Sequence, residues 1–221
     1  PYQQSFVRVG IIIIDNNHFQ RPTHDHVRHH VLLTTRFKTF AISVFVCMPL
    51  MEDAVTPVAL TPFVLRRGTE DLPETIQFRE KLDDLFGAGF GFNIYKRGEH
   101  QIIQFQMDTI QDKFVSTSVG NESLLKESLH FLGGLLTKPL IEHGGFRQKY
   151  VDAEKVTLQK RIEAIINDKT RYAAERCIQE MCKDEPYRLH PLGQIDALEH
   201  ITTASLYEHY ESWLSSAAID I

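Results

Sequence analysis

The segment 59-ALTPFVLRRGTE-70 is the clearest guide to the fold of this 221-residue chain. It forms the end of a helix that the apolar pattern predicts over residues 53–67, and Gly68 is a residue type that commonly ends helices. Pro62 lies inside the helix, where it removes a backbone donor and is expected to bend the axis. The segment contains no histidine, and no acidic residue precedes the Gly68-Thr69 turn.

The composition is that of a globular protein, with 43% hydrophobic residues, 24% charged residues and a formal net charge of −5. This mild negative charge argues against a nucleic-acid partner, which favours a basic surface. No apolar run reaches the length of about eighteen residues that a membrane-spanning helix needs, so we expect no membrane partner. The isoleucine run at 11–14 is too short for the apolar region of a secretory signal, so we expect a cytoplasmic protein.

The three cysteines, Cys47, Cys177 and Cys182, fit neither a disulfide framework nor a C-x-x-C zinc ribbon. We interpret them as buried free thiols in a reducing compartment. Lys183 follows Cys182 and would favour its thiolate, but the sequence identifies no histidine partner, so a catalytic cysteine is not favoured.

Strands are predicted on both sides of the opening helix. Residues 29–34 and 40–49 indicate two strands, the second apolar on both faces as in a central strand. After a predicted helix over 75–86, residues 88–96 and 100–108 alternate with period two around a turn, which predicts a hairpin.

Most of the remaining chain has helical patterning. Asn121 is expected to cap a helix that runs to about residue 137. Longer helices are predicted over 146–167 and 169–183, and the last helix begins near Thr203. In the helix that Asn121 is expected to cap, the buried stripe is predicted to consist of Leu125, Leu129, Leu132 and Leu136. The inward positions of the helix over 169–183 are predicted to be Ala173, Cys177 and Met181.

The order of elements predicts an α+β fold, with a mainly antiparallel sheet and helices packed on one side of it. Residues 218–221 have the pattern of another strand. We therefore expect a divergent segment at 1–26, one domain over 27–221, and a longer protein of which this chain is a part.

Five segments occur in a fixed order along the chain: 28-RHHVLLTTRFKT-39, 61-TPFVLRRGTEDLPET-75, 81-KLDDLFGAGFGFNIYKRGEH-100, 150-YVDAEKVTLQKRIEAIINDK-169 and 185-EPYRLHPLGQIDALEHIT-202. Together they resemble the N-terminal domain of the pitrilysin/insulinase metallopeptidase family, and in particular its bacterial paralogues that lack the zinc motif. The resemblance implies a metallopeptidase-like (LuxS/MPP-like) sandwich.

Active members of this family carry H-x-x-E-H on the helix before a Gly-Thr turn, where two histidines bind zinc and the glutamate polarises the bound water. Aligning Gly68-Thr69 with that turn places Ala59, Pro62 and Phe63 at the first His, the Glu and the second His. Matching Glu154 to the first acid of the later helix places Arg161 at the third ligand. These four side chains imply that no metal or zinc cofactor is bound, and that no catalytic residue remains here.

Other sites are less well supported by the sequence. His24 and His26 would share a face of a strand and lie near His29 and His30, but we interpret this group as solvated or as an adventitious metal site. The glycines of 87-GAGFG-91 follow a helix and precede a strand, the reverse of the dinucleotide fingerprint. Six further histidines are scattered singly: His100, His130, His143, His190, His200 and His209.

In active relatives, the strand that matches residues 88–96 is a sheet edge to which substrate peptides add by main-chain pairing. The resemblance therefore implies Phe90, Gly91 and Phe92 as candidate peptide-binding residues; the alternative is a buried hairpin strand. Tyr187 and Arg188 match a family loop, but relatives usually have glycine at the second position, which weakens a role for this loop.

Three functions remain open from the sequence. The first is a catalytically inactive homologue that pairs with an active paralogous peptidase and helps enclose or bind peptides or small proteins. The second is a metal-dependent peptidase whose ligands come from elsewhere in the chain. The third is a structural or assembly protein that kept only the fold.

Overall fold

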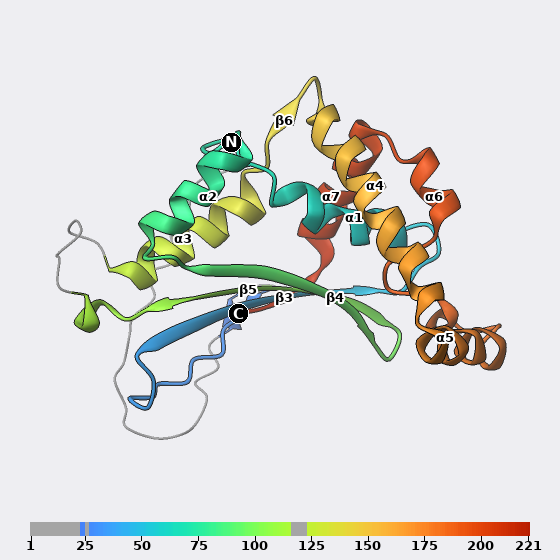
Figure 1. The fold of residues 1–221 in the computed structure, drawn as a ribbon, viewed down its shortest axis with the longest axis horizontal. Coiled ribbons are helices and arrows are strands. Elements are labelled where there is room, and N and C mark those ends of the chain that lie inside the picture. The colour runs from blue at the N-terminus through green and yellow to red at the C-terminus, as the bar shows by residue number, and fades with distance from the viewer. Residues whose placement is uncertain (1–22, 25–26, 116–122) are drawn as a thin grey trace.

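A computed structural model describes residues 23–24, 27–115 and 123–221 of the chain. It confirms the predicted fold class, because helices cover one face of a six-stranded sheet (Figure 1). The strand order is β1-β2-β8-β3-β5-β4, and every neighbouring pair is antiparallel except β2–β8, which is parallel. The strands are β1 (Thr23–His24), β2 (Val27–Arg28), β3 (Thr39–Pro49), β4 (Gly89–Arg97), β5 (His100–Ile110) and β8 (Ala218–Asp220), with a separate pair β6 (Ile141–Glu142) and β7 (Gly145–Phe146).

Helices make up most of the second half of the chain. The α-helices are α1 (Val55–Leu65), α2 (Thr75–Asp84), α3 (Leu124–Thr137), α4 (Gln148–Ala164), α5 (Lys169–Met181), α6 (Ile195–His200) and α7 (Thr203–Ser216). Short 3₁₀ helices are η1 (Asp112–Phe114), η2 (Ile165–Asn167) and η3 (Pro186–Arg188).

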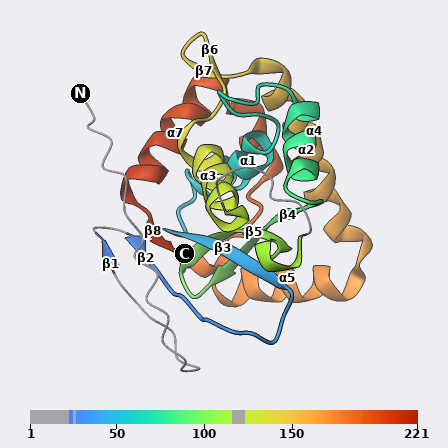
Figure 2. The same ribbon diagram turned by 90° about the vertical axis from the view of Figure 1, so that its left-hand side faces the viewer.

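The core lies between the sheet and the helical layer. Every residue of α1 is buried, as expected for a helix that is apolar on all sides. It packs against β5, α4 and α7 and lies in the interior of the helical layer (Figure 2). Alternate residues of β3 and β5 face the helical layer, and each fully buried aliphatic or Phe side chain contributes about 1.5–3 kcal/mol. These inward residues are Ile42, Val44, Val46, Ile103, Phe105 and Met107.

The hairpin and the last strand agree with the sequence analysis, but the first predicted strand does not. β4 and β5 match the predicted hairpin closely, and residues 218–220 form β8. The predicted strand at 29–34 is wrong, because the regular strand β2 ends at Arg28. β8 lies between β2 and β3, so the two segments expected to be neighbours are separated by residues from the far end of the chain.

Two helices differ from prediction in the face that they bury. In α3, Leu129 is exposed and the buried stripe is Leu124, Ser128, Phe131, Leu132, Leu135 and Leu136. The cap of α3 is Ser123, whose side chain accepts a hydrogen bond from the Lys126 backbone N–H, whereas Asn121 lies outside the described residues. In α5 the predicted stripe is wrong, because this helix buries none of its residues and Met181 is 77% exposed.

Gly68 has a different role from the one the sequence indicated. Helix α1 ends at Leu65, and Gly68 is not among the glycines with a positive φ. A side chain at this position would place its Cβ 2.6 Å from the Pro73 carbonyl oxygen and 2.9 Å from that of Leu72. Glycine is therefore required here because two backbone segments approach each other closely.

Gly193 has both a positive φ and a close backbone neighbour, so substitution at this position is expected to destabilise the protein. Its φ is +78°, and an added Cβ would lie 2.3 Å from Thr56 Oγ1 and 2.6 Å from Thr56 Cα at the start of α1. We expect Gly193→Ala to lower the free energy of unfolding by about 2 kcal/mol or more, measured by urea denaturation.

Gly133→Ala is the matched control for this prediction. Gly133 lies inside α3, and an added Cβ there meets no atom within 4 Å. The control should stabilise the protein by about 0.5–1 kcal/mol, because alanine is the better helix former. Equal effects of the two substitutions would contradict the close approach of residue 193 to α1.

Candidate functional site

The positions matched to the zinc motif lie in the most deeply buried helix of the structure. Ala59 and Phe63 on α1 have no exposed surface, and Pro62 between them is also buried. The Phe63 ring meets the Phe92 ring of β4 edge to face, with centroids 4.9 Å apart and an interplanar angle of 80°. Such pairs stabilise a core by about 0.5–1.5 kcal/mol beyond their buried area. The second histidine position is therefore occupied by a core aromatic residue.

Two guanidinium groups lie over this aromatic pair. Arg161, on α4, has its Cζ atom 4.8 Å from the centroid of the Phe63 ring. Arg66, just after α1, has its Cζ atom 5.7 Å from the Phe63 centroid and 5.6 Å from that of Phe92. All three distances are within the range of cation–π attraction. The structure thus places Arg161 against Phe63, with positive charge where the resemblance places a metal ligand.

Glu154 on α4 is the buried acid of this region. Its side chain has no exposed surface; its Oε1 accepts a hydrogen bond from Arg67 Nε, and its Oε2 lies 3.7 Å from Arg66 Nη2. A carboxylate held in this way is already compensated by two arginines. Glu154 therefore binds α4 to the end of α1, and its charge is committed within the protein.

The charged groups around Arg66 are mostly positive. Burial lowers the pKa of the Arg66 guanidinium from its ordinary value, and nearby Arg67, Arg161 and Arg79 lower it as well, whereas Glu154 raises it. The neighbouring charges named here are three cations and one anion. The region is consequently electropositive, which opposes the binding of a divalent cation.

The arginine–glutamate contact was missed by the sequence analysis, although a signal for it exists. Glu154 falls between Val151 and Leu158 on the buried stripe of α4. An acid at such a position needs a partner, because an isolated buried charge is strongly disfavoured. The two adjacent arginines after α1 are the natural candidates, since that helix packs against α4.

The histidine group near the N-terminus does not form a metal site among the described residues. His30 Nε2 lies 2.7 Å from Asp220 Oδ1, so this ring is bound to a carboxylate of β8. His26 and the side chain of His24 lie outside the described residues. Within residues 27–115 and 123–221, no group of three or more His, Cys, Asp or Glu is arranged to hold a metal ion.

The candidate peptide-binding residues lie on an edge of the sheet. β4 pairs with β5 on one side, and no described strand pairs with its other side. Arg97 and His100 flank a two-residue turn, and backbone groups alternate in direction along an antiparallel ladder. This alternation turns the N–H and C=O groups of Phe90 and Phe92 away from β5. Gly91, between them, is exposed, whereas Phe90 and Phe92 are half-buried.

The loop that holds Tyr187 and Arg188 supports the far end of this strand. Lys96 Nζ donates hydrogen bonds to the backbone oxygens of Tyr187 at 2.7 Å and Leu189 at 3.1 Å, and lies 4.3 Å from the Tyr187 ring centroid. Burial lowers the pKa of Lys96, and the charge of Glu175 opposes this shift. The loop therefore fixes the position of β4 by contacts from its own backbone.

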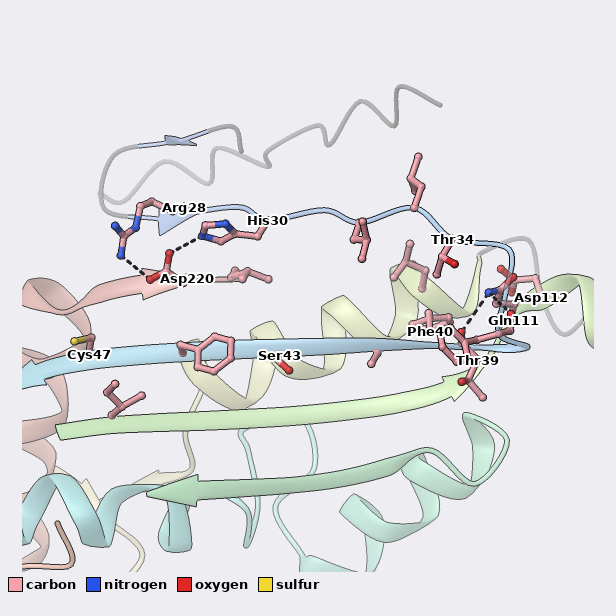
Figure 3. A pocket seen from close by; sticks show the side chains of 18 of the residues that line it. Arg28, His30, Thr34, Thr39, Phe40, Ser43, Cys47, Gln111, Asp112 and Asp220 are labelled. Atoms are coloured by element: carbon pink, nitrogen blue, oxygen red, sulfur yellow. Dashed lines mark hydrogen bonds and ion pairs between the residues drawn. The ribbon is translucent and has the colours of Figure 1, made fainter. Parts of the chain in front are cut away.

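A separate cavity of about 1360 Å³ lies on the other face of the sheet (Figure 3). Its floor includes Ser43, Phe45 and Cys47, the residues of β3 that alternate with the core residues. At its edge, Asp220 accepts hydrogen bonds from Arg28 at 2.6 Å and from His30 at 2.7 Å. Burial raises the pKa of Asp220, but these bonds outweigh burial and the pKa is lowered overall. This cavity is distinct from the Phe63 region.

Comparisons with known proteins identify a sequence relative and solved structures of similar fold. No model of a known protein family matches the chain. The chain is 38% identical over 198 residues to a Bacillus subtilis (strain 168) protein named "Probable inactive metalloprotease YmfF", covering 90% of this chain and 46% of that protein. The chain thus spans about half the length of the relative that it matches.

Two solved structures are similar in fold. A conserved protein from Enterococcus faecalis V583 has a TM-score of 0.84 at 25% identity, over 93% of this chain and 48% of that protein. The inactive domain of an M16 peptidase from Pseudomonas fluorescens has a TM-score of 0.65 at 13% identity, over 91% of this chain and 45% of that chain.

In the described residues, no helix is both long and apolar enough to cross a membrane. The sequence contains no H-x-x-E-H motif. The chain is similar in sequence to a probable inactive metalloprotease, and it has the fold of the inactive domain of an M16 peptidase.

Proposed function

We propose that this chain is a non-catalytic part of a peptidase assembly, which pairs with an active paralogue and binds extended peptides at the free edge of β4. The observation that carries the first half of this proposal is the packing of Phe63. Its ring fills the second histidine position and is covered by Arg161 and Arg66. A benzyl group offers no lone pair to a metal ion.

Electrostatics supports the same conclusion. A dication about 5 Å from one guanidinium would be repelled by roughly 7 kcal/mol at an effective dielectric constant near 20, and less where water screens the charge. Arg161 is exposed, so its share is the more strongly screened. Even a fraction of this repulsion opposes zinc binding, because no described group of ligands offsets it.

The second half of the proposal rests on β4. An unpaired edge strand presents a row of N–H and C=O groups to which an extended peptide adds by main-chain hydrogen bonds. All residues of β4, Gly89–Arg97, pair with β5. Near the end of the strand, Lys96 donates a hydrogen bond to the backbone oxygen of Tyr187. On this edge the backbone groups of Phe90 and Phe92 face the peptide, whereas those of Gly91, which lies exposed between them, pair with β5.

A cytoplasmic location is part of the proposal. Cys47, Cys177 and Cys182 are all free thiols, but the prediction that they are buried is wrong, because Cys177 is exposed and Cys47 and Cys182 are only partly buried. Free thiols persist in compartments that keep cysteines reduced.

The test uses the whole protein and a fluorescent unstructured peptide, without and with N-methyl groups on alternate residues. N-methylation removes backbone donors but keeps the side chains. Each lost hydrogen bond costs about 0.5–1.5 kcal/mol, so blocking three should weaken binding at least tenfold. Fluorescence anisotropy measures both affinities.

The same preparation tests the absence of catalysis. After dialysis against a chelator and return of zinc, we expect substoichiometric metal and no peptide hydrolysis by the protein alone. Hydrolysis should appear when an active paralogue is added, at a rate above that of the paralogue alone. Stoichiometric zinc with hydrolysis by the isolated protein would instead support a peptidase with ligands from elsewhere. Equal affinities of the methylated and unmethylated peptides would contradict main-chain binding at the edge of β4. If neither peptide binds, a structural or assembly role would be favoured.

A further inference from the structure

The region around Phe63 carries more positive than negative charge. Three arginines, Arg66, Arg67 and Arg161, converge on the ends of α1 and α4, and the ion pairs that Arg66 and Arg67 form are both with Glu154. Arg161 makes no ion pair within the described part of the chain. Two positive charges therefore remain uncompensated among these four residues.

The arginine pair, defined as Arg66 and Arg161, shares one aromatic platform. Both Cζ atoms lie within 6 Å of the Phe63 centroid, at 5.7 and 4.8 Å. Stacking on a ring holds a guanidinium in place while its N–H donors stay available at the edges of the plane. Two such groups close together form a natural site for a carboxylate, which accepts bidentate hydrogen bonds.

The arginine pair lies beside the peptide-binding edge. Arg66 Cζ is 5.6 Å from the centroid of Phe92, which is in the middle of β4 (Gly89–Arg97). The Phe92 ring points toward α1, since it contacts Phe63 at 4.9 Å. A strand added beside β4 would direct alternate side chains to this same face of the sheet.

We infer that the arginine pair receives the carboxylate of an acidic side chain within an extended peptide bound along β4. This inference rests on the proposed function, and it adds a preference for peptides with Asp or Glu at the position nearest Phe92.

The position of the arginine pair along β4 favours an acidic side chain inside the peptide over the peptide's C-terminal carboxylate as the bound group. Phe92 has three residues of β4 before it and five after it, so a peptide that pairs with the whole edge continues past Phe92 in both directions. A terminal carboxylate at this point would leave half of the edge unpaired. The lowered pKa of Arg66, to which burial and the neighbouring arginines both contribute, agrees with a site that an anion would stabilise.

The test compares two peptides that are capped at both ends and differ only by Glu or Gln at the central position. We expect the Glu peptide to bind the whole protein about tenfold more tightly than the Gln peptide at low salt, because charge-assisted hydrogen bonds exceed neutral ones. The advantage should shrink as ionic strength rises. Fluorescence anisotropy gives both affinities, and a Gln peptide with a free C-terminal carboxylate serves as the third probe.

The variant Arg161→Gln tests whether the arginine pair causes the preference for the Glu peptide. It removes one charge from an exposed side chain that has no acidic partner among the described residues, so the fold should be retained, as checked by thermal unfolding. The Glu advantage should fall to about twofold or less. Arg176→Gln removes the same charge from α5, where Arg176 pairs with Glu180, and should leave the advantage unchanged.

Each outcome separates this inference from the function on which it rests. Equal binding of the Glu and Gln peptides would overturn the carboxylate site and leave edge binding intact. If neither peptide binds, the proposed function fails as well. A tenfold gain for the free C-terminus would overturn the internal position, and an unchanged advantage in Arg161→Gln would overturn the assignment to the arginine pair.

Discussion

Replacement of Phe63 by alanine is expected to lower the free energy of unfolding by about 4 kcal/mol, within the range for Phe-to-Ala changes in a packed core. Phe63 has no exposed surface, and it contacts the Phe92 ring as well as the arginine pair. The loss therefore combines a cavity in the core with the removal of one edge-to-face contact and two cation–π contacts. Urea denaturation followed by circular dichroism measures the change.

Two controls separate these contributions. Phe63→Leu retains most of the buried volume but not the ring, and should cost about 1–2 kcal/mol. Phe37→Ala removes the same side chain at a position that is 62% exposed, and should change stability by less than about 0.5 kcal/mol. A cost below about 1 kcal/mol for Phe63→Ala would show that this position is not part of the core, and would weaken the argument against zinc.

Glu154→Ala is expected to lower the free energy of unfolding by about 3 kcal/mol. Removal of one member of a buried ion pair typically costs about 3–5 kcal/mol, because the other charge is left without compensation. The lower end applies here, since the Arg67 side chain is 31% exposed and can recover some hydration. Chemical denaturation at neutral pH measures the effect.

The conservative and surface variants make the Glu154 prediction specific. Glu154→Gln keeps an oxygen acceptor for Arg67 but removes the charge, so its cost should fall between zero and that of alanine. Glu163→Ala lies on the same helix at an exposed position and should change stability by less than about 0.5 kcal/mol. Equal costs for Glu154→Ala and Glu163→Ala would indicate that the arginine contacts contribute no stability.

Local patterns predicted some parts of the fold well. The hairpin of β4 and β5 follows from period-two alternation on both sides of a glycine-containing turn, and Gly98 adopts the positive φ of 56° that such turns favour. Helix α1 was recognisable because a long apolar run has few alternatives. In these cases the information lies within about twenty neighbouring residues.

The errors arose where tertiary packing decides the outcome. In α3, Leu132 and Leu136 of the predicted stripe are buried and Leu125 is half-buried, but Leu129 is exposed, and Leu124, Phe131 and Leu135 complete the inward face. α5 contacts η2 and η3, but the stripe of Ala173, Cys177 and Met181 is exposed. Periodicity indicates that a face exists but not which surface, if any, covers it.

Some features of the candidate site were also predictable from the sequence, and others were not. The family resemblance implies that zinc ligands are missing at residues 59, 63 and 161 and the glutamate at residue 62, when Gly68-Thr69 and Glu154 are aligned with the family. The packing around these positions does not follow from the sequence, because the contacts of Arg66 with Phe92 and of Arg67 with Glu154 join segments far apart in the chain. Those contacts depend on how α4 packs across α1.

The position of β8 has a consequence for the order in which the molecule can assemble. Phe45 in β3 pairs with Asp220, so one side of this central strand acquires its partner only after almost all of the described chain has been synthesised. On the ribosome, the β3–β5 ladder can form first and would then expose a bare strand edge until residues 218–220 emerge. Pairings across such a long sequence separation form slowly, and bare edges attract other chains. Nascent copies of this protein would therefore pass through a state in which β3 is open to intermolecular pairing.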